Sequence, residues 1–256
     1  MAAFEEFQSF NWYVIGYSRT TRLRKQLSIS CDRSDSANQY IVYHCKSDTV
    51  SLHDGRDIVL STTHFLDKPL TLAVMYGCTE EIIDERAWWL ERCAKSAFHP
   101  LVLPMIFADI ERSRFLDAID LKATELEARI LELESRVKKE TTKEPTKEET
   151  NADGRKTMTE RDCNAIQLCR SMTSLKNGLV SLATELQSMR NHLQELPKFA
   201  RNREPDIPGW RRDLDDDGTH IDAKLKAIMD ELQSKRRTCE GFLGAMTMAT
   251  QMVRKL

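Results

Sequence analysis

The sequence predicts an α+β, mostly helical fold, in which a small N-terminal α/β portion precedes an antiparallel bundle of three long heptad-patterned helices. Two observations favour this class. Short apolar runs separated by polar turns occupy the first part of the chain, which is typical of a small sheet. Apolar residues then recur at alternating spacings of three and four along three long stretches, as in helices that pack side by side. We therefore expect an α/β portion over residues 1–100 and a long-helix stalk bundle over residues 101–256.

The α/β portion is expected to hold a small sheet. β-branched and aromatic residues are concentrated in the runs 12–17, 40–45, 58–60 and 70–76, and such residues favour strands. The polar stretch 19–38 is predicted to be a mobile loop.

A closing helix is predicted from Thr79 onward. Glu80 and Glu81 suit the positive end of a helix dipole, and the apolar positions that follow fit one helical face. His99 and Pro100 end this helix, because proline disfavours helical geometry in the residue before it. We assign His99 to a structural role at the corner rather than to catalysis.

Three heptad stretches, predicted at 104–138, 159–196 and 219–254, form the bundle. At 1.5 Å per residue each helix is about 50 to 57 Å long. Because helices of matched length can fold back on one another, we expect one core shared within the chain rather than three seams between chains. The helix-seam positions are Leu126, Ile130, Leu133, Leu175, Leu179, Leu182, Leu186, Leu225, Ile228 and Leu232.

Two links are expected between these helices. Residues of about 139–157 are rich in Lys, Glu and Thr and contain Pro145 and Gly154, which predicts a disordered linker. Residues of about 197–218 form a Pro/Gly/Asp link, and Pro197 is predicted to end the second helix.

Composition excludes several classes of protein. With 38 basic and 40 acidic residues the net charge is -2, so no overall field attracts nucleic acid or an anionic membrane. Uncharged runs are far shorter than the roughly 20 residues of a membrane span, and Glu5 and Glu6 stand where a secretory signal carries basic residues. Seven cysteines without C-x-x-C spacing favour a reducing compartment. We expect a soluble cytoplasmic protein.

One acidic run is a weak metal candidate. Asp213, Asp215, Asp217 and Gly218 match positions 1, 3, 5 and 6 of a calcium-binding EF-hand loop. Lys224 occupies the twelfth position, where the bidentate glutamate is required. An acidic loop before a helix is the favoured interpretation, and weak Mg²⁺ binding is the alternative. No other cofactor is expected.

No catalytic residue is assigned. The sequence contains no phosphate-binding, dinucleotide-binding or serine-hydrolase motif, and its histidines lack zinc-ligand spacing. Near the C-terminus, Met246, Met248 and Met252 follow Gly241 and Gly244. We predict that these methionines fill the core, with an adaptable binding face as the alternative.

Two blocks carry a family resemblance. The segment Ala87–Phe115, which includes AFHPLVLPMIFADIE at 97–111, and the segment Leu225–Met252 resemble the join and the stalk helix of fungal CorA-like proteins. The shorter block Ser174–Leu179 is similar in character. The resemblance implies a cytoplasmic α/β domain, a long stalk helix and a link to divalent-cation transport. The Gly-Met-Asn tripeptide of that family is not in the sequence, and the chain ends where a membrane helix would begin, so a membrane-less relative is implied.

Two functions follow as expectations. The first is a non-enzymatic cytosolic CorA-like helical module that acts by self-assembly, or by binding a related membrane-embedded protein through its helix seams, without being a transporter itself. The alternative is an accessory protein, conceivably an enzyme, of a fungal metabolic or biosynthetic pathway.

Overall fold

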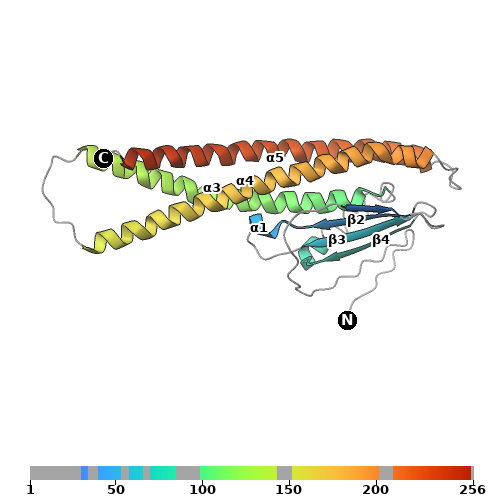
Figure 1. The fold of residues 1–256 in the computed structure, drawn as a ribbon, viewed down its shortest axis with the longest axis horizontal. Helices are drawn as coiled ribbons and strands as arrows, with labels where there is room; N and C mark the ends of the chain where they lie inside the picture. The colour runs from blue at the N-terminus through green and yellow to red at the C-terminus, as the bar shows by residue number, and fades with distance from the viewer. Residues whose placement is uncertain are drawn as a thin grey trace.

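In the part of the chain that the structure describes, the main elements are a small sheet and three long helices (Figure 1). The computed structural model describes residues 30–33, 40–52, 58–65, 70–84, 99–142, 152–201 and 210–254 of the 256-residue chain. The predicted class, α+β and mostly helical, is confirmed.

The sheet is antiparallel throughout, with its strands in chain order. The strands are β1 (Ser30–Arg33), β2 (Tyr40–Lys46), β3 (Val59–Phe65) and β4 (Leu70–Tyr76), and the short helix α1 (Thr49–Leu52) lies between β2 and β3. In register, Lys46 is opposite Val59, and Val59 is opposite Tyr76. The strand predicted at 12–17 lies outside the described residues.

The prediction of a loop over 19–38 is wrong at residues 30–33, where β1 pairs with β2. This strand is polar, but an edge strand can be polar because backbone hydrogen bonds join it to its neighbour. The predictions for β2 and β4 are confirmed, and β3 extends five residues beyond the predicted 58–60. The helix expected from Thr79 begins there, since residues 80–84 are helical and the Thr79 carbonyl accepts from the Ile83 amide at 3.1 Å; residues 85–98 lie outside the described residues.

One face of the sheet is buried against the helices. Burial alternates along β2 and β3, so that Tyr43, Cys45 and Leu60 point inward, as the period of two requires. Helix α3 (Val102–Thr142) lies between the sheet and the other long helices (Figure 1). Every residue from Leu101 to Ala108 is buried, because this part of α3 is enclosed by neighbours on all sides.

The bundle consists of α3, α4 (Ala152–Arg201) and α5 (Trp210–Arg254). Helix α3 runs away from the sheet end, α4 returns, and α5 runs away again (Figure 1). Nine of the ten predicted seam residues are buried in one core, and Ile130 packs against it partly buried. The expectation of one core shared within the chain is confirmed, so these seam side chains are enclosed within a single chain and do not lie on its surface.

The helices extend into both predicted links, and the bounds of those links were therefore wrong. α3 continues to Thr142 and α4 begins at Ala152. Lengthening an existing helix through Lys- and Glu-rich sequence costs less free energy than nucleating a new helix. α4 also passes Pro197 and ends at Arg201, since a proline near a helix end removes few hydrogen bonds. α5 begins at Trp210, and its acidic first turns are favoured by the helix dipole.

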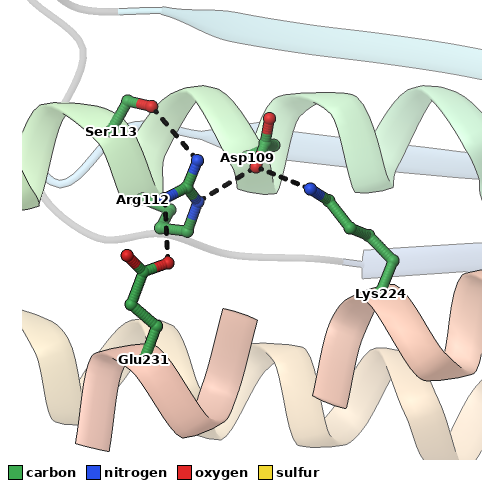
Figure 2. A network of polar contacts seen from close by, with 5 residues as sticks. All are labelled: Asp109, Arg112, Ser113, Lys224 and Glu231. Carbon is green, nitrogen blue, oxygen red and sulfur yellow. Dashed lines mark hydrogen bonds and ion pairs between the residues drawn. The ribbon is translucent and has the colours of Figure 1, made fainter. Parts of the chain in front are cut away.

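Ion pairs hold α5 against both other helices. In Figure 2, Arg112 of α3 lies between Asp109 and Glu231, with Nε 3.0 Å from Asp109 Oδ1 and Nη1 2.8 Å from Glu231 Oε2. Lys224 Nζ also lies 3.5 Å from Asp109 Oδ1. Three turns further along α3, Asp120 Oδ1 lies 2.5 Å from Nζ of Lys235. These pairs fix α3 and α5 as parallel neighbours.

On the other side of α5, Arg190 of α4 makes a two-pronged contact with Asp222. Its Nε donates to Oδ1 at 2.7 Å and its Nη2 donates to Oδ2 at 2.9 Å. These hydrogen bonds hold the pKa of Asp222 below its usual value. The geometry matches a planar guanidinium with a planar carboxylate, so it fixes the relative position of the antiparallel helices.

Gly178 allows α4 to approach its neighbours closely. A Cβ atom placed on it would lie 2.5 Å from Phe115 Cε1 and 2.7 Å from Ser51 Cβ. Phe115 and Ser51 are both buried, and close-packed interiors have little room for such neighbours to move. A side chain at this position therefore has no space.

We expect Gly178→Ala to lower the free energy of unfolding by about 2 kcal/mol, because overpacking outweighs the roughly 1 kcal/mol by which alanine favours a helix. Gly241 and Gly244 are matched controls in α5, where an added Cβ meets nothing within 4 Å. Alanine there should raise the free energy of unfolding by up to about 1 kcal/mol. Urea unfolding followed by circular dichroism measures all three variants, and similar stabilisation by all three would contradict the close approach.

Candidate functional site

The acidic run proposed as a metal candidate lies within α5 and does not form a loop. Asp215 and Asp217 occupy its early turns, and residues two apart on a helix point about 200° apart. Asp215 and Asp217 therefore do not converge as the ligands of an EF-hand loop do. Among the described residues, no group of three or more His, Cys, Asp or Glu side chains is placed to hold a metal ion.

Three histidines meet where the sheet, the start of α3 and the end of α4 come together. His99 Nδ1 accepts a hydrogen bond from the Leu101 amide at 3.1 Å, and its carbonyl accepts from Val102 at 3.1 Å. His99 thus holds the first turn of α3, as expected from its place at the corner. His192 Nε2 lies 2.9 Å from the Tyr43 hydroxyl, and His64 Nδ1 lies 2.9 Å from Thr71 Oγ1.

His99 and His64 of this corner are held in their neutral forms. Burial, together with the nearby His64 and His192, lowers the pKa of His99 to about 3. Burial lowers the pKa of His64 to about 4. Because His99 Nδ1 accepts from a backbone amide, the ring proton of the neutral form is on Nε2. The contacts of this corner connect parts of the fold.

A second polar cluster lies at the opposite end of the sheet, where Ser47 follows β2. The Ser47 hydroxyl donates to Glu111 Oε1 at 2.7 Å and accepts from the Ile58 amide at 3.0 Å. Arg114 Nη1 donates to Ser47 Oγ at 2.7 Å and to Glu111 Oε1 at 2.5 Å. Burial raises the pKa of Glu111, although the Arg114 charge and hydrogen bonds from Ser47, Arg114 and the Asp48 backbone oppose the rise. This cluster fastens the sheet to α3.

Among the described residues, a group of exposed apolar side chains lies on α5, near the end of the bundle that is remote from the sheet (Figure 1). Met248 is 64% exposed and Met252 is 54% exposed. Gly241, Gly244 and Ala245 are exposed on the same helix one or two turns earlier. We call these five residues the α5 outer face.

The prediction that the C-terminal methionines fill the core is correct for Met246 and wrong for Met248 and Met252. Met246 is 3% exposed and continues the heptad positions of Cys239 and Phe242. Met248 lies two residues later, about 200° around the helix from Met246, and so points away from the bundle. The heptad phase in the sequence contains this signal, because Met248 and Met252 do not fit the seam positions.

The α5 outer face differs from the remainder of the exposed surface of α5. Earlier in the helix the exposed side chains include Lys226, Asp230, Arg236, Arg237 and Glu240. From Gly241 to Val253 the helix has no charged residue. Exposed apolar groups gathered in one place mark a surface that contacts something else more often than isolated ones do.

No helix in the described part of the chain is long and apolar enough to cross a membrane. In comparisons with known proteins, the chain matches no protein-family model and no curated protein.

Proposed function

We propose that the chain is a non-enzymatic, cytoplasmic helical module that acts by assembling with itself or with a related membrane-embedded protein. The observation that carries this proposal is the α5 outer face, an uncharged surface with two largely exposed methionines at the end of a rigid bundle. Methionine side chains are flexible and polarisable, and they suit surfaces that pack against other proteins. The seam residues do not serve this purpose, because the bundle of one chain encloses them.

The bundle is suited to present such a surface. The three helices share one core, and the ion pairs of Arg112 and Arg190 fix α5 on both sides. A binding surface on a rigid element loses little conformational entropy when a partner binds. The segment Leu225–Met252 resembles the stalk helix of CorA-like proteins. Because of this resemblance, we include a CorA-like membrane protein among the proposed partners.

Two binding measurements test this function. Light scattering after size exclusion, with excess magnesium and then with chelator, gives the mass of the assembly against the 29.5 kDa of one chain. Binding to the purified cytoplasmic region of a full-length CorA-like protein is measured by calorimetry. We expect self-association or binding to that region. A chain that stays monomeric at every concentration and also fails to bind the CorA-like region would overturn the proposal.

A further inference from the structure

We propose that the open edge of β4 pairs with β4 of a second copy of this chain, antiparallel and centred on Ala73, so that the two sheets join into one. This surface belongs to the sheet, and the inference therefore stands apart from the function proposed for the α5 outer face. Three observations support it: the edge offers the backbone groups that a strand binds, it lacks the features that keep strands away, and its sequence is complementary to itself.

Among the described residues, β4 is paired on one side. The strand order is β1-β2-β3-β4, so β4 forms one edge of the sheet and its neighbour is β3 (Figure 1). The register with β3 continues without a bulge from Leu70 to Tyr76. In such a regular strand, alternate residues direct their N–H and C=O groups away from the neighbour. These groups form hydrogen bonds with an added strand, so the occupant that fits this edge is another strand.

The two edges of the sheet differ in how they resist pairing. β1 has four residues and carries Asp32 and Arg33, and a short, charged edge strand discourages the addition of another strand. β4 has seven residues and contains neither a charged residue nor a proline. Leu72 is 48% exposed and Tyr76 is 44% exposed. A regular, uncharged and exposed edge pairs readily, so β4 is the edge that a partner strand joins.

The order of residues makes β4 complementary to a second β4. Ala73 and Met75 pack against the core, and successive side chains point to opposite faces of a sheet. The outer face of β4 therefore holds four apolar residues, Leu70, Leu72, Val74 and Tyr76. In an antiparallel pair centred on Ala73, Leu72 lies opposite Val74 of the second copy, and Leu70 lies opposite Tyr76. Each contact occurs twice, as a twofold interface requires, and such apolar cross-strand pairs stabilise a sheet.

A centre at Ala73 suits both phases of the strand. Where Ala73 directs its backbone groups outward, the two copies of Ala73 exchange hydrogen bonds with each other. Where the alternate residues do so, Leu72 exchanges hydrogen bonds with Val74 of the second copy. An antiparallel ladder alternates between these two kinds of pair, so the same register forms hydrogen bonds in either phase.

Charge favours the antiparallel orientation. Glu80 and Glu81 are exposed in the helical turn that follows β4. A parallel pair would bring these carboxylates of the two copies together, where like charges repel. The antiparallel pair places them at opposite ends of strands about 24 Å long, which exceeds the Debye length of roughly 8 Å at physiological ionic strength. Asp67 and Lys68, which precede β4 and meet these carboxylates, have charges that cancel.

The size of this interface predicts a weak dimer. Each copy contributes one strand of seven residues, so the buried area is smaller than the roughly 1,600 Å² of a standard stable complex. We expect a reversible dimer with a dissociation constant on the order of 10 to 100 μM.

The test is sedimentation velocity of the full chain between about 5 and about 200 μM, concentrations that span this range. We expect the mean mass to rise with concentration toward that of two chains. Leu72→Lys should weaken the dimer at least about tenfold, because a charged edge opposes pairing and the twofold axis makes the change twice. Met248→Lys, on the α5 outer face, is the matched control and should dimerise as the unsubstituted chain does. Circular dichroism confirms that each variant is folded.

The double variant Leu72→Lys with Val74→Glu tests the register. In the antiparallel pair each new lysine lies opposite a new glutamate, so dimerisation should recover relative to Leu72→Lys. Hydrogen exchange tests the backbone pairing, since the amides of β4 should exchange more slowly as the concentration rises.

Two outcomes would overturn this inference. A dimer that Met248→Lys removes and Leu72→Lys leaves unchanged would do so while the function proposed for the α5 outer face stands. A chain that remains monomeric up to about 200 μM would do so as well, and that function would then depend on binding to the CorA-like region.

Discussion

Replacing Glu111 with alanine is expected to lower the free energy of unfolding by about 3 kcal/mol, which is typical when one member of a buried ion pair is removed. The Glu111 side chain is 1% exposed and the Arg114 side chain is 9% exposed. The substitution removes the carboxylate from the Arg114 guanidinium and from the Ser47 hydroxyl, and it leaves a cavity at the contact between the sheet and α3. Urea unfolding at pH 7 measures the change.

Glu111→Gln is the matched variant. Glutamine keeps the shape of the side chain and one acceptor oxygen, so we expect a loss of about 1 kcal/mol, the size of a single net hydrogen bond. A Glu111→Ala protein as stable as the unsubstituted chain would show that the cluster at Ser47 does not fasten the sheet to α3.

Acidification is expected to destabilise the fold by about 3 kcal/mol between pH 6.5 and 5, about 1.5 kcal/mol from each of two buried histidines. In the folded chain the pKa of His64 is lowered to about 4 and that of His99 to about 3, from an ordinary value of 6.5. Below pH 6.5 the unfolded chain therefore binds protons that the folded chain does not. Stability is fully present above pH 6.5 and falls as the pH decreases toward the folded-state values.

The slope of unfolding free energy against pH is the measurement. His99→Gln should reduce this slope by about half, whatever its effect on overall stability, because one of the two depressed groups is then gone. The raised pKa of Glu111 changes the unfolding free energy with pH in the opposite direction. Because Glu111 is present in both proteins, its effect cancels in the difference between His99→Gln and the unsubstituted chain. That difference therefore gives the contribution of His99. An unfolding free energy that is the same at pH 6.5 and 5 would contradict the neutral corner.

Much of the fold was predictable because its signals are local. The limits of β4 and the start of the helix at Thr79 agree with the sequence patterns. The seams of all three long helices also agree, since a spacing of three and four places side chains on one face of any helix. These patterns depend on residues within two or three turns of one another, which the sequence shows directly.

The errors occurred where distant contacts outweigh local preference. The polar residues of β1 form a strand because β2 provides a backbone edge. The Asp-rich stretch near Asp215 is helical because α5 extends back to Trp210, so the loop expected there is replaced by helix. In both cases other parts of the chain decide the conformation, and the local composition does not reveal them.

The candidate surface combines both kinds of information. The sequence by itself determined that α5 has an uncharged C-terminal stretch with glycines and methionines, and that Met246 alone of the three methionines is in phase with the seam. Only the tertiary structure decided that Met248, Met252, Gly241 and Gly244 are uncovered by the described neighbours, while Gly178 is enclosed by Phe115 and Ser51. The physical reason is that composition and periodicity are properties of one segment, whereas exposure depends on which other segments pack against it.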